Sequence, residues 1–287
     1  MARADRADPC VITRFAPSPT GPLHLGHAFS ALTAWDLAQA HGGTFLLRIE
    51  DIDRSRARPE WEAMIADDLA WLGLDWPTPV LRQSDRLTVY AEALDRLWDA
   101  GLLFPCRCRR RDILEAASAP QEGAPMGPDG VIYPGTCRDE PRTGPRPQDT
   151  ALRLDMNLAV ERIGDPTFSD LPDTVGDVVL ARRDMGTSYH LSVVIDDADQ
   201  GVTDVVRGED LADATPIHLL LQCLLSLPTP TYHHHRLIRD ASGKRLAKRD
   251  DARALVTFRA DGCTPEDIRR MVGLQPSTVS RPSSTEV

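Results

Sequence analysis

Apolar residues follow two periods along this chain, and their alternation predicts an α/β fold. Residues 11–15 predict a short strand. Apolar side chains then recur every three or four positions, at Ala28, Ala31, Leu32, Trp35 and Ala38. This spacing indicates a helix with one buried face, which Gly42 and Gly43 end before a buried strand at residues 44–49. The opening of the chain therefore predicts a strand–helix–strand unit.

The same patterns predict further helices and strands. One helix begins at Pro59, and Ser84 caps the next. The mostly apolar run at residues 189–196 predicts a parallel core strand, and residues 202–206 predict another. A very apolar helix opens at Thr215. We expect these strands to join the first two in a Rossmann-like sheet built from both ends of the chain.

At 287 residues the chain can form one large or two modest domains. We expect two halves of a nucleotide-binding catalytic domain (1–101 and 187–240), an inserted subdomain (102–186), a loop with a short helical end (241–274) and a disordered polar tail (275–287). Within the insert, residues 116–148 are rich in Pro, Gly and charge and predict a surface loop. A capped helix is expected from Pro265 to Met271.

The segment that joins the first strand to the first helix reads Arg14-Phe-Ala-Pro-Ser-Pro-Thr-Gly-Pro-Leu-His-Leu-Gly-His27. N–H groups at a helix N-terminus attract anions. His24 and His27 add hydrogen-bond donors one turn apart, and Gly26 lets the backbone approach a ligand closely. The combination predicts a phosphate-binding site. Two solvated histidines at a helix start are the simpler alternative.

This segment resembles the His-x-Gly-His signature of the class I aminoacyl-tRNA synthetases. The blocks Arg14-Phe-Ala-Pro-Ser-Pro-Thr-Gly21 and Leu47-Arg-Ile-Glu-Asp-Ile-Asp-Arg54 are similar to the glutamyl branch of that family. Further along, Gly243-Lys-Arg-Leu-Ala-Lys-Arg-Asp250 resembles the family's Lys-Met-Ser-Lys-Ser loop. Ala247 stands where the family usually has serine. The three blocks occur in the family's order along the chain.

The resemblance implies a binding site for ATP, with magnesium bound alongside the phosphates. Its residues would be His24, Gly26, His27 and Lys248. His24, His27 and Lys248 are implied as the catalytic residues. Activation of an amino acid by ATP requires the protein mainly to align the reactants and to stabilise negative charge on phosphate oxygens. Lys248 would close over the leaving pyrophosphate.

A pocket selective for glutamate needs two cations for its carboxylates and an anion for its ammonium group. Arg14, Glu50 and Arg207 end predicted strands, and open α/β sheets bind ligands at the carboxyl ends of their strands. The pattern leaves open which arginine meets which carboxylate, and any one arginine could instead form a surface salt bridge. The resemblance implies glutamate contacts at Arg14, Phe15, Ala16, Pro17, Ser18, Glu50, Tyr189 and Arg207.

Three of the six cysteines are grouped in a way that predicts one structural zinc ion. Cys106 and Cys108 are two positions apart, and a later loop brings Cys137. Spacing favours Tyr133 as the fourth ligand, the resemblance points to the same set, and water could take the place of the phenol. Three unrelated reduced thiols are the simpler alternative. The remaining cysteines, which we expect to be small hydrophobic residues, are Cys10, Cys223 and Cys263.

The net charge of −10 gives no overall basic field that would attract RNA. Two local basic clusters could contact RNA or simply face water: residues 233–253, and the group Arg107, Arg109, Arg110 and Arg111. No apolar run reaches the roughly 18 residues that span a bilayer, and the N-terminus lacks a signal-peptide core. We therefore expect a cytoplasmic monomer without membrane contact.

Almost nothing follows Lys248, whereas a full glutamyl-tRNA synthetase carries, by resemblance, a further helical domain that reads the anticodon. Without an anticodon-binding domain the layout resembles that of the glutamyl-Q tRNA(Asp) synthetases. That resemblance implies activation of L-glutamate as an adenylate and its transfer to queuosine in the anticodon loop of tRNA(Asp). The alternatives are a shortened enzyme that charges a tRNA 3′ end, a small-molecule nucleotidyltransferase of the same fold, and a non-catalytic RNA-binding relative that contains zinc.

Overall fold

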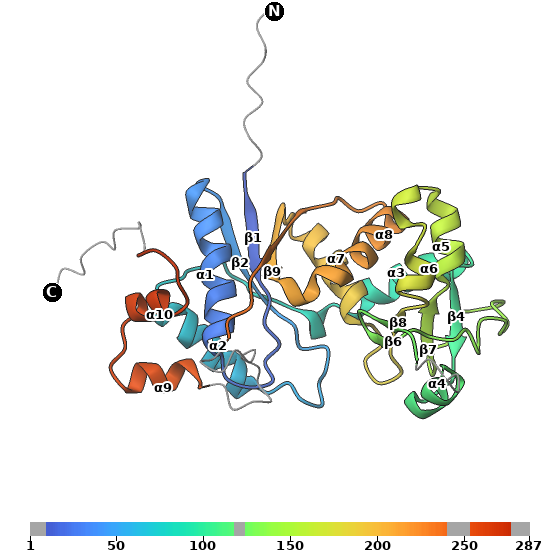
Figure 1. Cartoon of the computed structure of the whole chain (residues 1–287), viewed down its shortest axis with the longest axis horizontal. Coiled ribbons are helices and arrows are strands. Elements are labelled where there is room, and N and C mark those ends of the chain that lie inside the picture. Colours follow the sequence, from blue (N-terminus) through green and yellow to red (C-terminus); the bar gives the residue numbers. More distant parts are fainter. Residues whose placement is uncertain (1–9, 118–123, 240–252, 277–287) are drawn as a thin grey trace, which may run out of the picture.

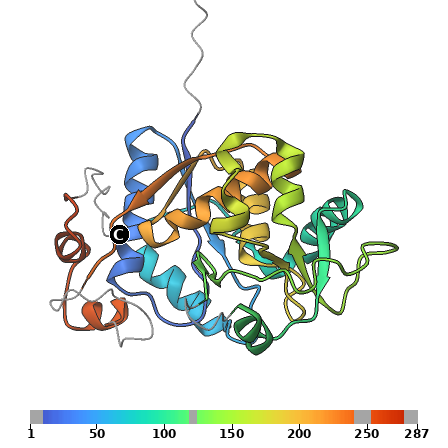
Figure 2. The ribbon, with the colours of Figure 1, turned by 45° about the vertical axis from the view of Figure 1, so that its right-hand side comes forward.

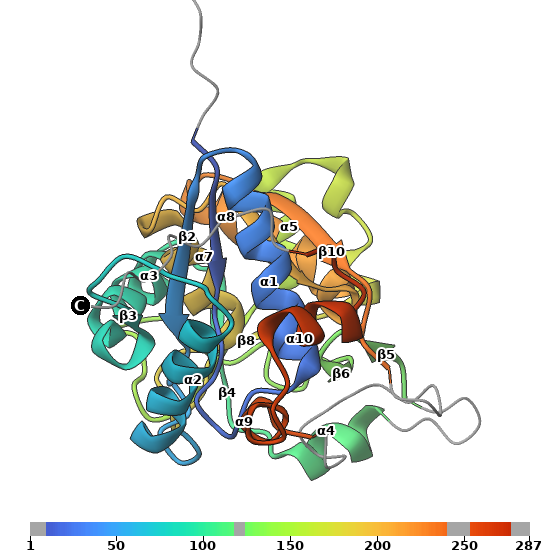
Figure 3. The same ribbon diagram turned by 90° about the vertical axis from the view of Figure 1, so that its left-hand side faces the viewer.

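The structure is a computed structural model that describes residues 10–117, 124–239 and 253–276. Its centre is a five-stranded parallel sheet with the strand order β10-β9-β1-β2-β3 (Figures 1 and 3). The strands are β1 (Ile12–Phe15), β2 (Thr44–Ile49), β3 (Leu81–Arg82), β9 (Asp204–Gly208) and β10 (Thr231–His235). Strands from both parts of the chain therefore meet in one sheet, as the sequence predicts.

Helices cover both faces of this sheet (Figure 1). One side carries α1 (Leu25–Ala40), α2 (Pro59–Trp71), α9 (Leu255–Ala260) and α10 (Pro265–Met271), and the other carries α7 (Tyr189–Asp199) and α8 (Thr215–Leu225). The first side buries an apolar core that includes Phe45, Leu69 and Ile268. The second buries another, which includes Leu191 and Leu220. Two packed layers around a parallel sheet make this an α/β fold.

The first helix forms as its sequence predicts. All five residues of its expected apolar face are buried: Ala28, Ala31, Leu32, Trp35 and Ala38. After α1, the chain turns back into β2 through Gly43. A Cβ at Gly43 would lie 2.0 Å from the carbonyl oxygen of Val11, so β2 can begin beside β1 only with glycine there. This close return places the starts of β1 and β2 side by side, with Ile12 paired with Thr44, so the two parallel strands also end near each other.

A second sheet lies beyond α7 and α8, and Figure 2 brings this end of the molecule forward. It is antiparallel, with the order β4-β7-β8, and falls within residues 102–186. A hairpin of β5 and β6 occurs where the sequence predicts only a surface loop. The chain enters this part through α3 (Leu87–Asp99). Its helices and strands are β4 (Leu103–Cys106), α4 (Arg110–Ala117), β5 (Met126–Gly127), β6 (Gly130–Val131), β7 (Ala151–Leu154), α5 (Met156–Ile163), α6 (Leu171–Thr174) and β8 (Val179–Ala181). The separation of 102–186 as an inserted subdomain remains a prediction.

Two local expectations from the sequence are wrong. Residues 189–196, expected as a strand, form the first part of α7. Its side chains are buried around most of the helix, so the apolar run has no helical period to reveal it. Ser84, expected to cap a helix, lies in the 3₁₀ turn Gln83–Asp85, and its N–H donates to Asp51 at 2.8 Å. The helix itself, α3, begins after that turn.

The short helix Pro265–Met271 has the predicted bounds, with Thr264 capping it. The expected signature loop at residues 243–250, including Lys248, lies outside the described residues, as does most of the expected tail. None of the helices in the described part of the chain combines the length and apolar character needed to cross a membrane.

Candidate active site

A pocket of about 560 Å³ opens at the carboxyl ends of β1, β2 and β9. Both sets of residues predicted from the sequence line it, except for Lys248, which lies outside the described residues. The lining includes the proposed phosphate-binding residues His24, Gly26 and His27 and the proposed glutamate-binding residues Arg14, Phe15, Ala16, Pro17, Ser18, Glu50, Tyr189 and Arg207. The parallel sheet thus brings two groups that are far apart in sequence into one cavity.

The two signature histidines are oriented by the start of α1. His24 caps the helix, and its Nδ1 accepts from the N–H of Gly26 at 3.1 Å. The Nδ1 of His27 accepts from the N–H of His24 at 3.2 Å, and the two rings stack with centroids 3.8 Å apart. Because both Nδ1 atoms are acceptors, each neutral ring carries its proton on Nε2. Both imidazoles are therefore set as Nε2–H donors.

Gly26 has a different local role from the one that the sequence suggests. A Cβ at this position would lie 3.0 Å from Cε1 and 3.1 Å from Nδ1 of His24. The missing side chain therefore makes room for the His24 ring over the first turn of the helix. We infer that glycine supports the capping geometry first, and any approach of a ligand second.

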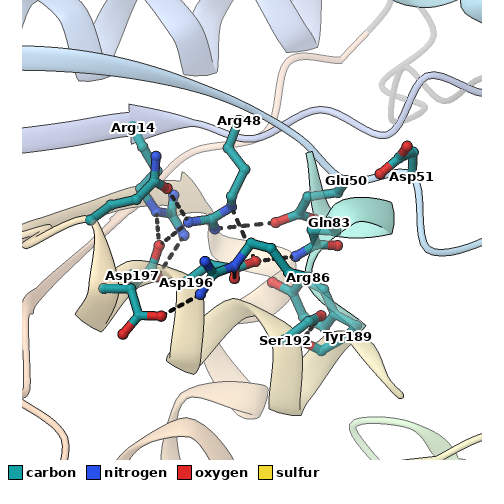
Figure 4. Close-up of polar contacts among 12 residues, drawn as sticks. Arg14, Arg48, Glu50, Asp51, Gln83, Arg86, Tyr189, Ser192, Asp196 and Asp197 are labelled. Carbon is teal, nitrogen blue, oxygen red and sulfur yellow. Dashed lines mark hydrogen bonds and ion pairs between the residues drawn. The ribbon is translucent and has the colours of Figure 1, made fainter. Parts of the chain in front are cut away.

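Arg14 is held by a carboxylate that sequence reasoning missed. Its Nε donates to Oδ1 of Asp197 at 2.9 Å, and its Nη2 donates to Oδ2 at 3.3 Å (Figure 4). Arg48 donates from Nη1 to the same Oδ1 at 2.7 Å. Burial alone would raise the pKa of Asp197, but the guanidinium groups of Arg14 and Arg48 outweigh it and lower that pKa. Asp197 is therefore an anion shared by two buried cations.

Arg48 also positions Glu50, the predicted anion of the pocket. Its Nη2 donates to Oε1 of Glu50 at 3.2 Å, and the Arg48 side chain is completely buried. Burial raises the pKa of Glu50, while Arg48 and Arg14 counteract part of that rise. The charged form of Glu50 would gain further from a bound ammonium group. A charged residue within the apolar run 44–49 was the sequence signal for this arrangement.

Asp196, which lies next to Asp197, is a second buried carboxylate of this network (Figure 4). It accepts from Gln83 Nε2 at 2.8 Å, from Arg86 Nε at 2.7 Å and from Tyr90 Oη at 2.9 Å. Asp196 and Asp197 are neighbours on α7, so one helix holds both groups of partners. Satisfied buried charges of this kind fix side chains in place before a ligand arrives.

Arg207 is buried in an environment unlike that of Arg14. Its guanidinium donates to His218 Nδ1 at 2.9 Å and to Thr215 Oγ1 at 2.8 Å, and it lies 4.9 Å from the centroid of the Tyr232 ring. Among the described residues, no carboxylate forms an ion pair with it. A buried cation with neutral partners favours an anionic ligand, because the anion supplies the missing countercharge.

The predicted metal-binding residues meet in a separate cluster beside β4. The Sγ atoms of Cys106, Cys108 and Cys137 all lie within 4.8 Å of one another. Tyr133 Oη is 3.5 Å from the Sγ atoms of Cys106 and Cys108, and it accepts from the N–H of Cys137 at 2.8 Å. Sulfur atoms around one tetrahedral zinc ion lie about 3.8 Å apart, given zinc–sulfur bonds of about 2.3 Å. The four side chains therefore fit one zinc ion.

Protonation of this cluster depends on its surroundings. Burial raises the pKa of the Cys108 thiol to about 11, and burial also raises the pKa of Tyr133. A metal cation would favour the deprotonated forms of both side chains. A phenolate at Tyr133 therefore needs the metal beside it.

Comparison with known sequences places the chain among synthetases. The family model for tRNA synthetases class I (E and Q), catalytic domain, matches residues 10–283. The Glutamyl-Q tRNA(Asp) synthetase of Rhodobacter capsulatus is 64% identical over 278 residues, which cover 92% of this chain and 100% of that protein. The Glutamyl-Q tRNA(Asp) synthetase of Nocardia farcinica is 45% identical over 274 residues, covering 92% of this chain and 85% of that protein.

Solved structures give the same fold. The crystal structure of a glutamate tRNA ligase from Elizabethkingia meningosepticum, in complex with its amino acid, superposes with a TM-score of 0.68 at 25% identity. The match covers 92% of this chain but 60% of the ligase, which is less than two thirds of that protein. The methionyl-tRNA synthetase of Mycobacterium tuberculosis superposes with a TM-score of 0.59 at 10% identity, covering 92% of this chain and 64% of that one, a likeness of fold alone.

Proposed function

This chain belongs to the class I tRNA synthetases (E and Q), and we propose that it activates L-glutamate with ATP and transfers it to the queuosine base of tRNA(Asp). One observation carries the activation step: a single pocket is lined by the histidines of the signature and by Arg14, Glu50 and Arg207. The names of the relatives support the choice of RNA, since they are glutamyl-Q tRNA(Asp) synthetases.

The amino acid would bind by matching its charges to the pocket. Arg207 offers a buried positive charge without a carboxylate partner among the described residues, and Arg14 offers a second cation. Glu50 would accept the ammonium group, which would stabilise its charged form. Phe15, Ala16, Pro17, Ser18 and Tyr189 would complete the contacts with glutamate. Fixed groups of this kind align the substrate with little loss of entropy at the moment of reaction.

In the chemical step, the α-carboxylate of glutamate attacks the α-phosphorus of ATP and pyrophosphate leaves. The Nε2–H groups of His24 and His27 would donate to phosphate oxygens, where negative charge develops. Lys248, outside the described residues, would contact the departing pyrophosphate. Magnesium would accompany the ATP and neutralise part of its charge.

The transfer step requires a hydroxyl of the RNA at the same pocket. We propose the cyclopentenediol of queuosine as that acceptor, with exposed arginines near the cysteine cluster, such as Arg109 and Arg110, contacting phosphates. Cys106, Cys108, Tyr133 and Cys137 would hold one structural zinc ion that stabilises this part of the chain. We also propose that the protein acts in the cytoplasm, where ATP and tRNA are found, and that it acts as a monomer.

Transfer of labelled glutamate to tRNA(Asp) tests the proposal. The purified protein should glutamylate tRNA(Asp) that carries queuosine and leave the same tRNA without queuosine unlabelled. tRNA(Glu) is the matched control for 3′-end charging. Labelling of tRNA(Glu), with none on tRNA(Asp), would contradict the proposed acceptor while leaving glutamate activation intact.

A further inference from the structure

A chain of hydrogen bonds leads away from Arg207 and ends at the molecular surface. Arg207 Nη1 lies 2.9 Å from His218 Nδ1, and His218 Nε2 lies 3.0 Å from His190 Nδ1. His190 Nε2 lies 2.9 Å from Oδ2 and 3.0 Å from Oδ1 of Asp129. The four side chains come from β9, α8, α7 and the turn between β5 and β6. They connect the wall of the pocket with the hairpin.

Arg207 determines the direction of each hydrogen bond in this series. A guanidinium can only donate, so His218 Nδ1 must accept and its proton must lie on Nε2. His218 then donates to His190 Nδ1, which leaves the His190 proton on Nε2 to be donated to Asp129. Both imidazoles are therefore neutral Nε2–H tautomers. Burial lowers the pKa of His218 well below its ordinary value, which agrees with a neutral ring.

Of the two histidines and Asp129 in this series of hydrogen bonds, only Asp129 is well exposed to solvent. His218 is 1% exposed and His190 is 6% exposed, whereas the side chain of Asp129 is 54% exposed. Two buried histidines that bonded only each other would satisfy fewer of their nitrogen atoms. Here all four ring nitrogens are bonded, and the partners at the two ends are a cation of the pocket and a surface carboxylate. Through these hydrogen bonds, Asp129 can influence how the guanidinium of Arg207 is oriented.

We propose that Asp129 is a positioning residue for the amino-acid substrate, acting on Arg207 through His190 and His218. By accepting from His190, it stabilises the same tautomers that Arg207 requires, in which Nδ1 of His218 is bare. That acceptor holds Nη1, while Thr215 Oγ1 and the Leu211 carbonyl hold Nη2, and together they fix the plane of the guanidinium. The inference rests on the proposed function in one respect only: the ligand that Arg207 meets is taken to be glutamate.

Kinetics of glutamate-dependent ATP–pyrophosphate exchange test this role. Asp129→Ala should raise the KM for glutamate by roughly fivefold, the effect of losing one hydrogen bond of ordinary strength, because Asp129 acts on Arg207 only through two histidines; kcat and the KM for ATP should change less than about twofold. Asp129→Asn keeps an oxygen acceptor for His190 and should restore most of the affinity. Asp139→Ala, an exposed aspartate of the same segment, should behave as the wild type.

A variant of His190 and a double variant test whether Asp129 acts through His190. His190→Leu removes both the acceptor for His218 and the link to Asp129, so it should raise the KM for glutamate at least as much as Asp129→Ala does. The double variant Asp129→Ala/His190→Leu should be no worse than His190→Leu alone, because Asp129 acts only through His190. Additive losses in the double variant would overturn the proposal, as would an unchanged KM for glutamate in Asp129→Ala.

Nitrogen-15 NMR of the imidazole rings provides a readout that is independent of activity. In the wild type, His190 and His218 should both show a protonated Nε2 and a bare Nδ1, with signals assigned through His190→Asn and His218→Asn. A protonated Nδ1 on either ring would overturn the proposal. If the wild type showed no glutamate-dependent exchange, the proposed function would fail. The tautomers would still show whether the hydrogen bonds from Arg207 to Asp129 exist as described.

Discussion

Asp197 binds the guanidinium of Arg14 through both carboxylate oxygens: Oδ1 accepts from Nε at 2.9 Å, and Oδ2 accepts from Nη2 at 3.3 Å. The two residues lie 183 positions apart in the chain, and both side chains are buried, at 5% and 4% exposure. Arg48 binds the same carboxylate at 2.7 Å. One anion thus fixes an arginine of the pocket and ties β1 and β2 to α7.

Removal of the charge of Asp197 should therefore destabilise the fold. Asp197→Asn is expected to lower the free energy of unfolding by about 3 kcal/mol, because Arg14 and Arg48 would remain buried without their shared countercharge. Denaturant titration followed by circular dichroism measures this loss. Asp199→Asn, on the same helix but with a side chain 48% exposed, should cost less than about 1 kcal/mol. Equal losses in the two variants would contradict this account of the network.

Arg207 is buried and pairs with no carboxylate of the described residues, so its charge should be essential for binding of the amino acid. Arg207→Gln is expected to raise the KM for glutamate by about 100-fold, as loss of one buried charged hydrogen bond to a carboxylate would do. The KM for ATP should change less than about threefold. Initial rates of pyrophosphate exchange, with each substrate varied in turn, measure both constants. A loss confined to ATP binding would assign Arg207 to the nucleotide.

Asp68 provides a prediction about stability and pH, away from the pocket. Burial raises its pKa from 3.8 to about 6, with Asp67 adding to the rise and Arg259 opposing it. A raised folded-state pKa means that the stability this carboxyl allows is complete below pH 3.8 and is lost as the pH rises through about 6. Asp68→Asn, neutral at every pH, should raise the free energy of unfolding by up to about 3 kcal/mol at pH 7.5 and by about half of that at pH 5.

Urea titrations of the wild type and of Asp68→Asn at the two pH values measure this difference. Asp75→Asn, an exposed carboxylate beyond the end of α2, is the control and should change little at either pH. A gain for Asp68→Asn that was equal at pH 5 and pH 7.5 would show that its cause is not the ionisation of Asp68.

The cysteine cluster should bind one zinc ion per chain. Cys108→Ser removes one of its three thiolates and is expected to abolish stoichiometric zinc in metal analysis of the purified protein. Cys223→Ser changes an exposed cysteine outside the cluster and should keep the metal. RNA-free pyrophosphate exchange should survive loss of zinc better than transfer to tRNA, because the cluster lies apart from the pocket. Absence of zinc from the wild type would remove the claim.

The strand–helix–strand unit and the pocket could be predicted because their signals are local. The spacing of Ala28, Ala31 and Leu32 specifies one buried face, and Gly43 specifies a close turn. The ends of parallel strands share one edge of a sheet, so Arg14 and Arg207 could be placed together from sequence alone. These inferences needed no knowledge of distant contacts.

The ion network and α7 could not be predicted, because neither leaves a clear local signal in the sequence. α7 is buried around most of its circumference, so the amphipathic period that identifies a helix is lost. Arg48 meets Asp197 across 149 positions, and only the packed fold shows that pairing. A fully buried arginine inside an apolar strand was the one available signal, because such a residue requires a partner. The histidine chain from Arg207 to Asp129 was hidden in the same way.

The identity of the acceptor hydroxyl is the central claim, and removal of the tRNA 3′ terminus tests it most directly. tRNA(Asp) that carries queuosine but lacks its terminal adenosine should accept glutamate as well as the intact queuosine-containing tRNA does. Intact tRNA(Asp) without queuosine should accept none. Loss of labelling on removal of the terminal adenosine, with queuosine still present, would contradict the account and would identify ordinary charging of a tRNA 3′ end.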